Sequence, residues 1–228
     1  MIKSIYSIYI AIRPKTLVVS IAPVLVGTSL ALKNPHFSNM IFYLTIFASI
    51  FIQIGTNFTN DLYDYLRGAD DYRRIGPKRA VQSKLISKGS MRILIMLSFI
   101  SATLCGIPLV FWGGYPILII GILSIISGYA YTAGPYPLGY NGLGDIFVFF
   151  FFGPIAVCGT YYLQTHQVSV FSMNLGVIMG ALSVLLLCIN NVRDIETDRQ
   201  TGKRTLAVRM GAKFVRFIFI FLICICYL

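Results

Sequence analysis

The stretch that decides the fold runs from Asn57 to Arg79 and reads NFTNDLYDYLRGADDYRRIGPKR. A second stretch, NNVRDIETDRQTGKR over residues 190–204, holds three further acidic residues, and both stretches follow a long apolar run. The whole chain has only 8 acidic residues, so nearly all of them lie at the ends of two apolar segments. The first stretch contributes four of them, namely Asp61, Asp64, Asp70 and Asp71.

The composition predicts a membrane protein. Hydrophobic residues make up 57% of the 228 residues, charged residues make up 12%, and the mean hydropathy is +0.77. Soluble domains carry about 25% charged residues. We therefore expect an all-α membrane protein, a polytopic bundle in which residues 1–228 form a single domain of about seven helices. Apolar runs long enough for a ~30 Å hydrocarbon core lie at 14–32, 41–65, 92–112, 115–132, 142–163 and 171–192, and a seventh begins near 214.

The distribution of charge indicates orientation in a membrane and not a nucleic-acid partner. The net charge is +11, but the basic residues concentrate in loops at helix ends, chiefly 67–92 and 193–216. Four predicted helices separate these two segments, so both lie on one side of the membrane, with the connection at 131–145. The positive-inside rule makes that side the cytoplasm, together with the N-terminus. We expect an integral protein of the plasma membrane.

The cysteines and histidines do not predict a metal centre. All 5 cysteines lie inside apolar segments without metal-type spacing, which indicates small buried hydrophobic side chains. His36 and His166 lie in connecting loops with no partner ligand nearby.

The spacing of the acidic residues predicts a magnesium site. Each stretch places an asparagine and two aspartates on one helix face, since the spacings are i, i+4, i+7 and i, i+4, i+8. Carboxylates that share a face repel one another, and hard oxygen ligands on two facing helices suit Mg²⁺, which bridges to phosphate oxygens. The two sets are Asn57, Asp61 and Asp64, and Asn190, Asp194 and Asp198.

Basic side chains beside the acids indicate a diphosphate substrate. Arginine and lysine bind phosphate charge. An acidic metal site at the mouth of an apolar chamber suits an isoprenyl diphosphate, whose tail enters the apolar interior while its head meets the metal. The metal and the basic groups then stabilise the leaving diphosphate. The candidate residues are Arg67, Arg73, Arg74, Lys78, Arg79, Arg193, Lys203 and Arg204.

Several of these features have a simpler interpretation as well. Mixed charge at a helix end is usually a solvated loop, although asparagine and aspartate on an apolar helix face are costly near a bilayer and functional by default. Arg13 and Lys15 either anchor the first helix at the membrane surface or contact substrate. Asp145 either favours a helix N-terminus through the helix dipole or faces the same chamber as the acidic stretches.

The two acidic stretches resemble the aspartate motifs of the UbiA superfamily of intramembrane aromatic prenyltransferases. NDLYDYLRGAD is similar to the first motif and NNVRDIETD to the second. RPKTL, APVLVGT, GADDYRRIGPKR, YTAGPYPLGYNGLGD and FFGPIAVCGTYYLQ resemble the branch of menaquinone synthesis that prenylates 1,4-dihydroxy-2-naphthoate. Many members carry an aspartate where this chain has Gly68, and Asp70 follows two residues later, as in the naphthoate branch.

The resemblance implies nine helices around a chamber, and Mg²⁺-dependent transfer of a polyprenyl group from polyprenyl diphosphate to dihydroxynaphthoate. The acceptor carboxylate is lost and demethylmenaquinone is formed. By position, the resemblance implies catalytic aspartates that hold Mg²⁺ and diphosphate at Asp61, Asp64, Asp194 and Asp198, with Asn57 as a further ligand. It also implies substrate contacts for Arg67, Asp70, Lys78, Arg193 and Lys203.

Other functions fit the same residues. A relative that acts on another aromatic acceptor, such as 4-hydroxybenzoate or a chlorophyllide-type ring, would keep the metal site and change the acceptor pocket. Because this chain ends in its seventh helix and the family has nine, a truncated inactive membrane protein is another alternative. A cation-binding transporter would carry its acids near mid-membrane. The acids here lie at helix ends, which favours the enzyme.

Overall fold

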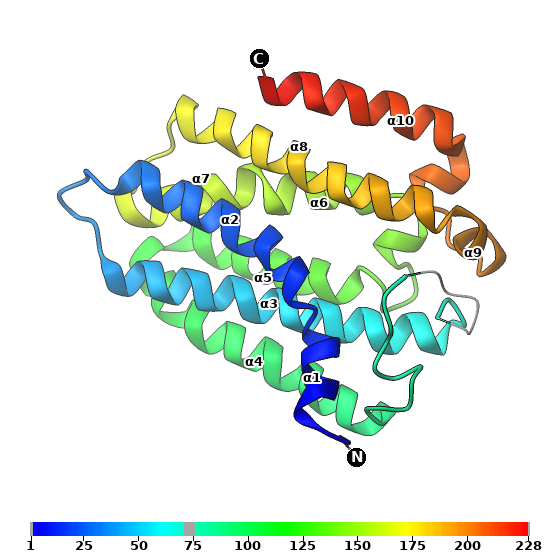
Figure 1. The fold of residues 1–228 in the computed structure, drawn as a ribbon. Coiled ribbons are helices and arrows are strands. Elements are labelled where there is room, and N and C mark those ends of the chain that lie inside the picture. Colours follow the sequence, from blue (N-terminus) through cyan, green and yellow to red (C-terminus); the bar gives the residue numbers. More distant parts are fainter. Residues whose placement is uncertain (1, 71–75, 228) are drawn as a thin grey trace.

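The computed structural model describes residues 2–70 and 76–227, and it shows a bundle of long helices (Figure 1). Every predicted membrane helix is present within this part of the chain. Six candidate spans are long and apolar enough to cross a membrane, so the chain is an integral membrane protein. The long helices are α2 (Pro14–Ala31), α3 (Asn39–Leu66), α4 (Lys88–Gly113), α5 (Tyr115–Ala130), α8 (Val170–Arg193) and α10 (Leu206–Tyr227), with α6 (Gly144–Phe152) and α7 (Pro154–Thr165) forming one span.

Three details differ from the prediction. The span expected at 142–163 is broken at Gly153, because Pro154 has no backbone N–H and begins a new helix. Two short helices were not predicted, α1 (Ile5–Ile12) and α9 (Ile195–Gln200). The last helix, α10, spans Leu206–Tyr227 but is interrupted at Gly211, whose φ of 82° and ψ of 164° are not helical, so its second part begins close to the predicted 214.

Serine side chains begin three of the membrane helices. Ser38, Ser87 and Ser169 precede α3, α4 and α8, and each hydroxyl accepts a hydrogen bond from the backbone N–H three residues later. These bonds satisfy N–H groups that have no partner within the helix. A serine immediately before each of these three helices therefore determines where the helix starts.

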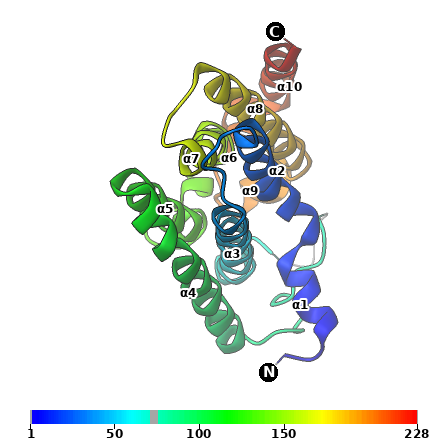
Figure 2. The same ribbon diagram turned by 90° about the vertical axis from the view of Figure 1, so that its left-hand side faces the viewer.

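The helices pack around α3, which contacts α1, α2, α4, α5 and α7. Figure 2 shows α3 close to end-on near the middle of the bundle, with α10 against α8 at the top of the view. Large apolar side chains such as Phe111 and Phe217 are exposed on the surface, at 88% and 67%. This outer surface suits lipid, because the bilayer core is as apolar as these side chains.

The polar connections gather at one end of the bundle. The chain after α3, the connection between α5 and α6, and α9 all lie at the right-hand end in Figure 1. Residues from all three segments line one cavity. These connections therefore meet at one end of the bundle, as the sequence predicts.

Glycines allow α6 and α7 to approach α8 closely. A Cβ atom on Gly176 would lie 2.7 Å from the backbone Cα of Pro154, and one on Gly180 would lie 2.5 Å from the backbone oxygen of Phe149. Both distances are shorter than van der Waals contact. Small residues at these positions are what membrane helices use to pack backbone against backbone.

We expect Gly176→Ala to separate α7 from α8 and to destabilise the protein by about 1–3 kcal/mol, because overpacking displaces backbone atoms. Thermal unfolding in detergent measures this effect. The matched control is Gly106→Ala in α4, where a Cβ atom would meet nothing within 4 Å, and we expect a change within about 1 kcal/mol, in the stabilising direction. Equal melting temperatures for both variants would contradict the close packing.

Candidate active site

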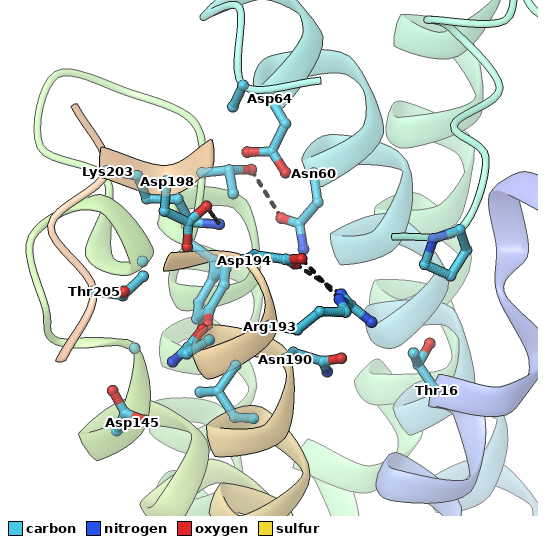
Figure 3. Close-up of a pocket in the computed structure, with 18 of the residues that line it drawn as sticks. Thr16, Asn60, Asp64, Asp145, Asn190, Arg193, Asp194, Asp198, Lys203 and Thr205 are labelled. Carbon is cyan, nitrogen blue, oxygen red and sulfur yellow. Dashed lines mark hydrogen bonds and ion pairs between the residues drawn. The ribbon is translucent and has the colours of Figure 1, made fainter. Parts of the chain in front are cut away.

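A cavity of about 210 Å³ lies at the polar end of the bundle (Figure 3). Its walls come from α2, α3, α6, α8, α9 and the loops between them, so it collects segments that are far apart in the sequence. The polar side chains that line it include Arg13, Thr16, Asn60, Asp64, Arg79, Tyr131, Asp145, Asn190, Asn191, Arg193, Asp194, Asp198, Lys203 and Thr205.

Asp64 is the acid that α3 contributes to this cavity. Its Oδ1 accepts a hydrogen bond of 2.9 Å from the Tyr140 hydroxyl, and its Oδ2 forms an ion pair of 3.1 Å with Nη2 of Arg79. Arg79 also reaches Asp70, whose Oδ2 lies 2.9 Å from the arginine Nε. Burial and the charge of Asp64 raise the pKa of Tyr140, so this phenol stays a neutral donor.

The second acidic stretch presents two carboxylates to the same cavity. Arg193 binds both oxygens of Asp194, at 2.7 Å from Nε and 2.7 Å from Nη2. Nζ of Lys203 lies 3.6 Å from Oδ1 of Asp198. Burial raises the pKa of Asp198, Lys203 lowers it, and the charges of Asp194 and Asp64 raise it further. Acids from α3 and α9 therefore act on one another across the cavity.

The cavity has the donor chemistry that a hard divalent cation requires. Carboxylate and amide oxygens from two opposite walls line it, and Mg²⁺ needs few protein ligands because it keeps several waters. Each of the three carboxylates already has a basic partner, and within residues 2–70 and 76–227 no group of three His, Cys, Asp or Glu side chains is close enough to hold a metal. A bound cation would replace these basic partners. The fitting ligands are Asn60, Asp64, Asn190, Asp194 and Asp198.

Asn57 and Asp61, which the sequence predicts as magnesium ligands, lie behind the part of α3 that reaches the cavity. Neither lines the cavity. The Asn57 amide donates to the backbone oxygen of Ile12 at 2.7 Å and to the Thr16 hydroxyl at 2.8 Å, so it ties α3 to the start of α2. Two Asn–Asp pairs on α3 share the i, i+4 spacing and lie only about 60° apart around the helix. The pair that reaches the cavity is Asn60 and Asp64.

Asp61 holds the loop that follows α3. Its carboxylate is fully buried, and its two oxygens accept hydrogen bonds of 2.9 Å each from the backbone N–H groups of Ala80 and Val81. Arg79 immediately precedes these residues. Asp61 therefore fixes the segment of chain that carries the Arg79 guanidinium to Asp64.

The other predicted substrate contacts have different positions. Arg67 donates to the backbone oxygen of Gly134 at 2.6 Å and lies over the Tyr140 ring, outside the cavity. Asp70 is buried against Arg79, and Lys78 is exposed and does not line the cavity. Asp71, Arg73 and Arg74 lie outside the described residues.

Asn60 is the functional candidate that sequence reasoning missed. Its Oδ1 accepts a hydrogen bond of 2.8 Å from the Thr132 hydroxyl, which orients the amide at the cavity wall. The sequence does contain a signal for it, because Asn60 and Asp64 repeat the spacing of Asn190 and Asp194.

We expect Asp61→Asn to loosen the loop at residues 79–81, because an amide offers only one acceptor to two N–H groups. Loss of a hydrogen bond to a charged group costs about 1.5–3 kcal/mol, so the Ala80 and Val81 amides should exchange with deuterium about tenfold faster or more. Hydrogen-exchange mass spectrometry of that peptide is the measurement. Glu196→Gln, at an exposed carboxylate on α9, is the matched control. Unchanged exchange in the Asp61 variant would contradict the role of Asp61.

Known proteins resemble this chain over most of its length. Residues 20–228 match the profile described as the UbiA prenyltransferase family. The chain is 41% identical over 213 residues to the 1,4-dihydroxy-2-naphthoate octaprenyltransferase of Haemophilus influenzae, covering 88% of this chain and 68% of that protein. It is 39% identical over 207 residues to the Escherichia coli protein of the same name, covering 88% and 67%.

Solved structures match the fold. A UbiA homolog from Archaeoglobus fulgidus bound to GPP and Mg²⁺ superposes with a TM-score of 0.77 at 17% sequence identity, covering 96% of this chain and 75% of that chain. The same homolog bound to DMAPP and Mg²⁺ gives a TM-score of 0.74 with the same coverage. At this identity the likeness establishes the arrangement of helices.

Proposed function

Because this chain belongs to the UbiA prenyltransferase family, we propose that it transfers a polyprenyl group from polyprenyl diphosphate to 1,4-dihydroxy-2-naphthoate. The acceptor loses its carboxylate, and the product is the prenylated hydroquinone demethylmenaquinol, because the transfer removes no electrons. The observation that carries the proposal is that Asn60 and Asp64 on α3 line one cavity with Asn190, Asp194 and Asp198 from the second acidic stretch. The relatives named for this reaction support the choice of acceptor.

These five residues are the proposed ligands for magnesium. When bound, Mg²⁺ would supply positive charge that stabilises the negative charge developing on the leaving diphosphate as the C–O bond breaks. The carboxylates supply the hard oxygen ligands that this ion prefers, and the asparagine amides add neutral oxygens. The neighbours solved with Mg²⁺ and prenyl diphosphates support this assignment.

The basic side chains bind the diphosphate in this proposal. Arg79, Arg193 and Lys203 neutralise the three acids in the structure, and all three line the cavity. The guanidinium and ammonium groups of these side chains carry the donors that diphosphate oxygens would accept from. The protein thus holds the leaving group with the same cations that stabilise the acids before substrate arrives.

The proposed location is the plasma membrane, with the cavity on the cytoplasmic side. The loops at the cavity end carry most of the basic residues, as the positive-inside rule requires for the cytoplasmic face. The prenyl chain would extend from the cavity toward the apolar bundle, where the surrounding helices and lipid exclude water from it.

The reaction can be tested with purified protein in lipid, a polyprenyl diphosphate, dihydroxynaphthoate and Mg²⁺, with EDTA as the metal-free control. We expect product only with the metal, detected by liquid chromatography with mass spectrometry. Product from 4-hydroxybenzoate instead would keep the chemistry and change the acceptor. No product from either acceptor would contradict the proposal.

We expect Asp64→Asn and Asp194→Asn each to lower kcat by about 10²-fold or more, because each removes a charge that holds the metal and the leaving group. Membrane insertion should be unchanged. Glu196→Gln removes a carboxylate from the same stretch that is exposed and does not line the cavity, so its activity should stay normal. Near-normal turnover in either aspartate variant would refute the assignment of that residue.

A further inference from the structure

Asp145 is a fourth carboxylate in the cavity, and it lies apart from the proposed diphosphate site. It is in the first turn of α6, which begins after the connection at 131–143. In Figure 3, Asp145 and Asp64 lie at opposite ends of the labelled group of side chains, with Asp194 and Asp198 between them. Asp145 therefore belongs to the part of the cavity away from the end of α3.

The surroundings of Asp145 differ from those of the other three acids. Asp64, Asp194 and Asp198 each have a basic partner. Oδ1 of Asp145 is buried, and within the described chain it has no hydrogen-bond partner. A buried carboxylate oxygen without a donor costs free energy, so the geometry leaves room for a donor from a bound molecule.

Tyr131, just after α5, lies near enough to Asp145 for the charge of the carboxylate to affect it. Burial raises the pKa of Tyr131, and the charges of Asp145, Asp64 and Asp198 raise it further, so the phenol keeps its proton. No cation within the described residues compensates Asp145, which makes this part of the cavity unfavourable for a diphosphate.

Of the two substrates of the proposed reaction, only the aromatic acceptor can supply the missing donor. The diphosphate is an anion and the prenyl chain has no polar hydrogen, whereas an aromatic acceptor carries ring hydroxyl groups. We propose that Asp145 accepts a hydrogen bond from a ring hydroxyl of the aromatic acceptor and removes its proton as the new bond forms. This inference rests on the proposed function, and it assigns the part of the cavity around Asp145 to the aromatic acceptor.

The hydroxyl proton passes to Oδ1 of Asp145, and the electron pair left on the oxygen increases the nucleophilicity of the ring carbon that is prenylated. That carbon forms the bond to C1 of the prenyl group as the C–O bond to diphosphate breaks, and the electron pair leaves with the diphosphate. The acceptor carboxylate then departs as CO₂, its bonding pair restores the aromatic ring, and Asp145 returns the proton to the ring oxygen.

The test compares wild type and Asp145→Asn with acceptors that differ by one hydroxyl, namely 1,4-dihydroxy-2-naphthoate, 1-hydroxy-2-naphthoate and 4-hydroxy-2-naphthoate. Acceptor binding is followed by naphthoate fluorescence with Mg²⁺ and a non-reactive prenyl diphosphate analogue, and turnover is measured separately. For the dihydroxy acceptor we expect kcat/KM to fall by about 10²-fold or more, with the KM for prenyl diphosphate unchanged. With the acceptor that lacks the contacted hydroxyl, the substitution should have little further effect on binding or turnover.

Two controls separate this inference from a structural role and from the proposed function. Glu196→Gln should behave as wild type with every acceptor. A loss that is equal for all three acceptors, or an unchanged kcat/KM in Asp145→Asn, would overturn the assignment, because a carboxylate that only favours the start of α6 does not distinguish acceptors. If wild type forms no product, the proposed function fails, and the binding titrations still decide whether Asp145 contacts a ring hydroxyl.

Discussion

The buried contact among Arg79, Asp64 and Tyr140 is the interaction on which the polar end of the molecule depends. It joins the end of α3, the loop after it and the connection between α5 and α6, which are far apart in the chain. Removing one partner of a buried ion pair leaves the other charge uncompensated, at a cost of about 3–5 kcal/mol. All three segments contribute to the wall of the cavity.

The surroundings of each aspartate assign it a different task, although all carry the same functional group. Asp61 meets two backbone N–H groups and positions a loop. Asp64 and Asp198 form ion pairs with basic side chains, and a carboxylate in such a pair can exchange the basic side chain for a metal ion. Asp145 meets neutral neighbours and has an oxygen without a partner, which suits it to a ligand hydroxyl. The charge around each carboxylate therefore determines its chemical role within the cavity.

Before substrate binds, the carboxylates of the cavity need opposing positive charge, and the basic residues supply it. Burial and the charges of Asp194 and Asp64 raise the pKa of Asp198, and at the edge of a bilayer water screens these charges poorly. Arg79, Arg193 and Lys203 supply the opposing charge from within the chain. The same two arginines and one lysine can also bind an anionic leaving group. One set of basic residues therefore serves both to neutralise the acids and to bind the diphosphate.

The membrane helices, with bounds to within a few residues for most of them, and the gathering of the polar loops at one end follow from sequence alone, because a bilayer requires long apolar segments and alternates their direction. The sequence also indicates the acids, the metal and the family. Which Asn–Asp pair of α3 enters the cavity depends on tertiary packing, since Asn57 with Asp61 and Asn60 with Asp64 have equal spacing and differ by about 60° around the helix. The contact of Asp61 with Ala80 and the placement of Asp145 opposite Asp64 likewise depend on how distant segments pack, which no local pattern records.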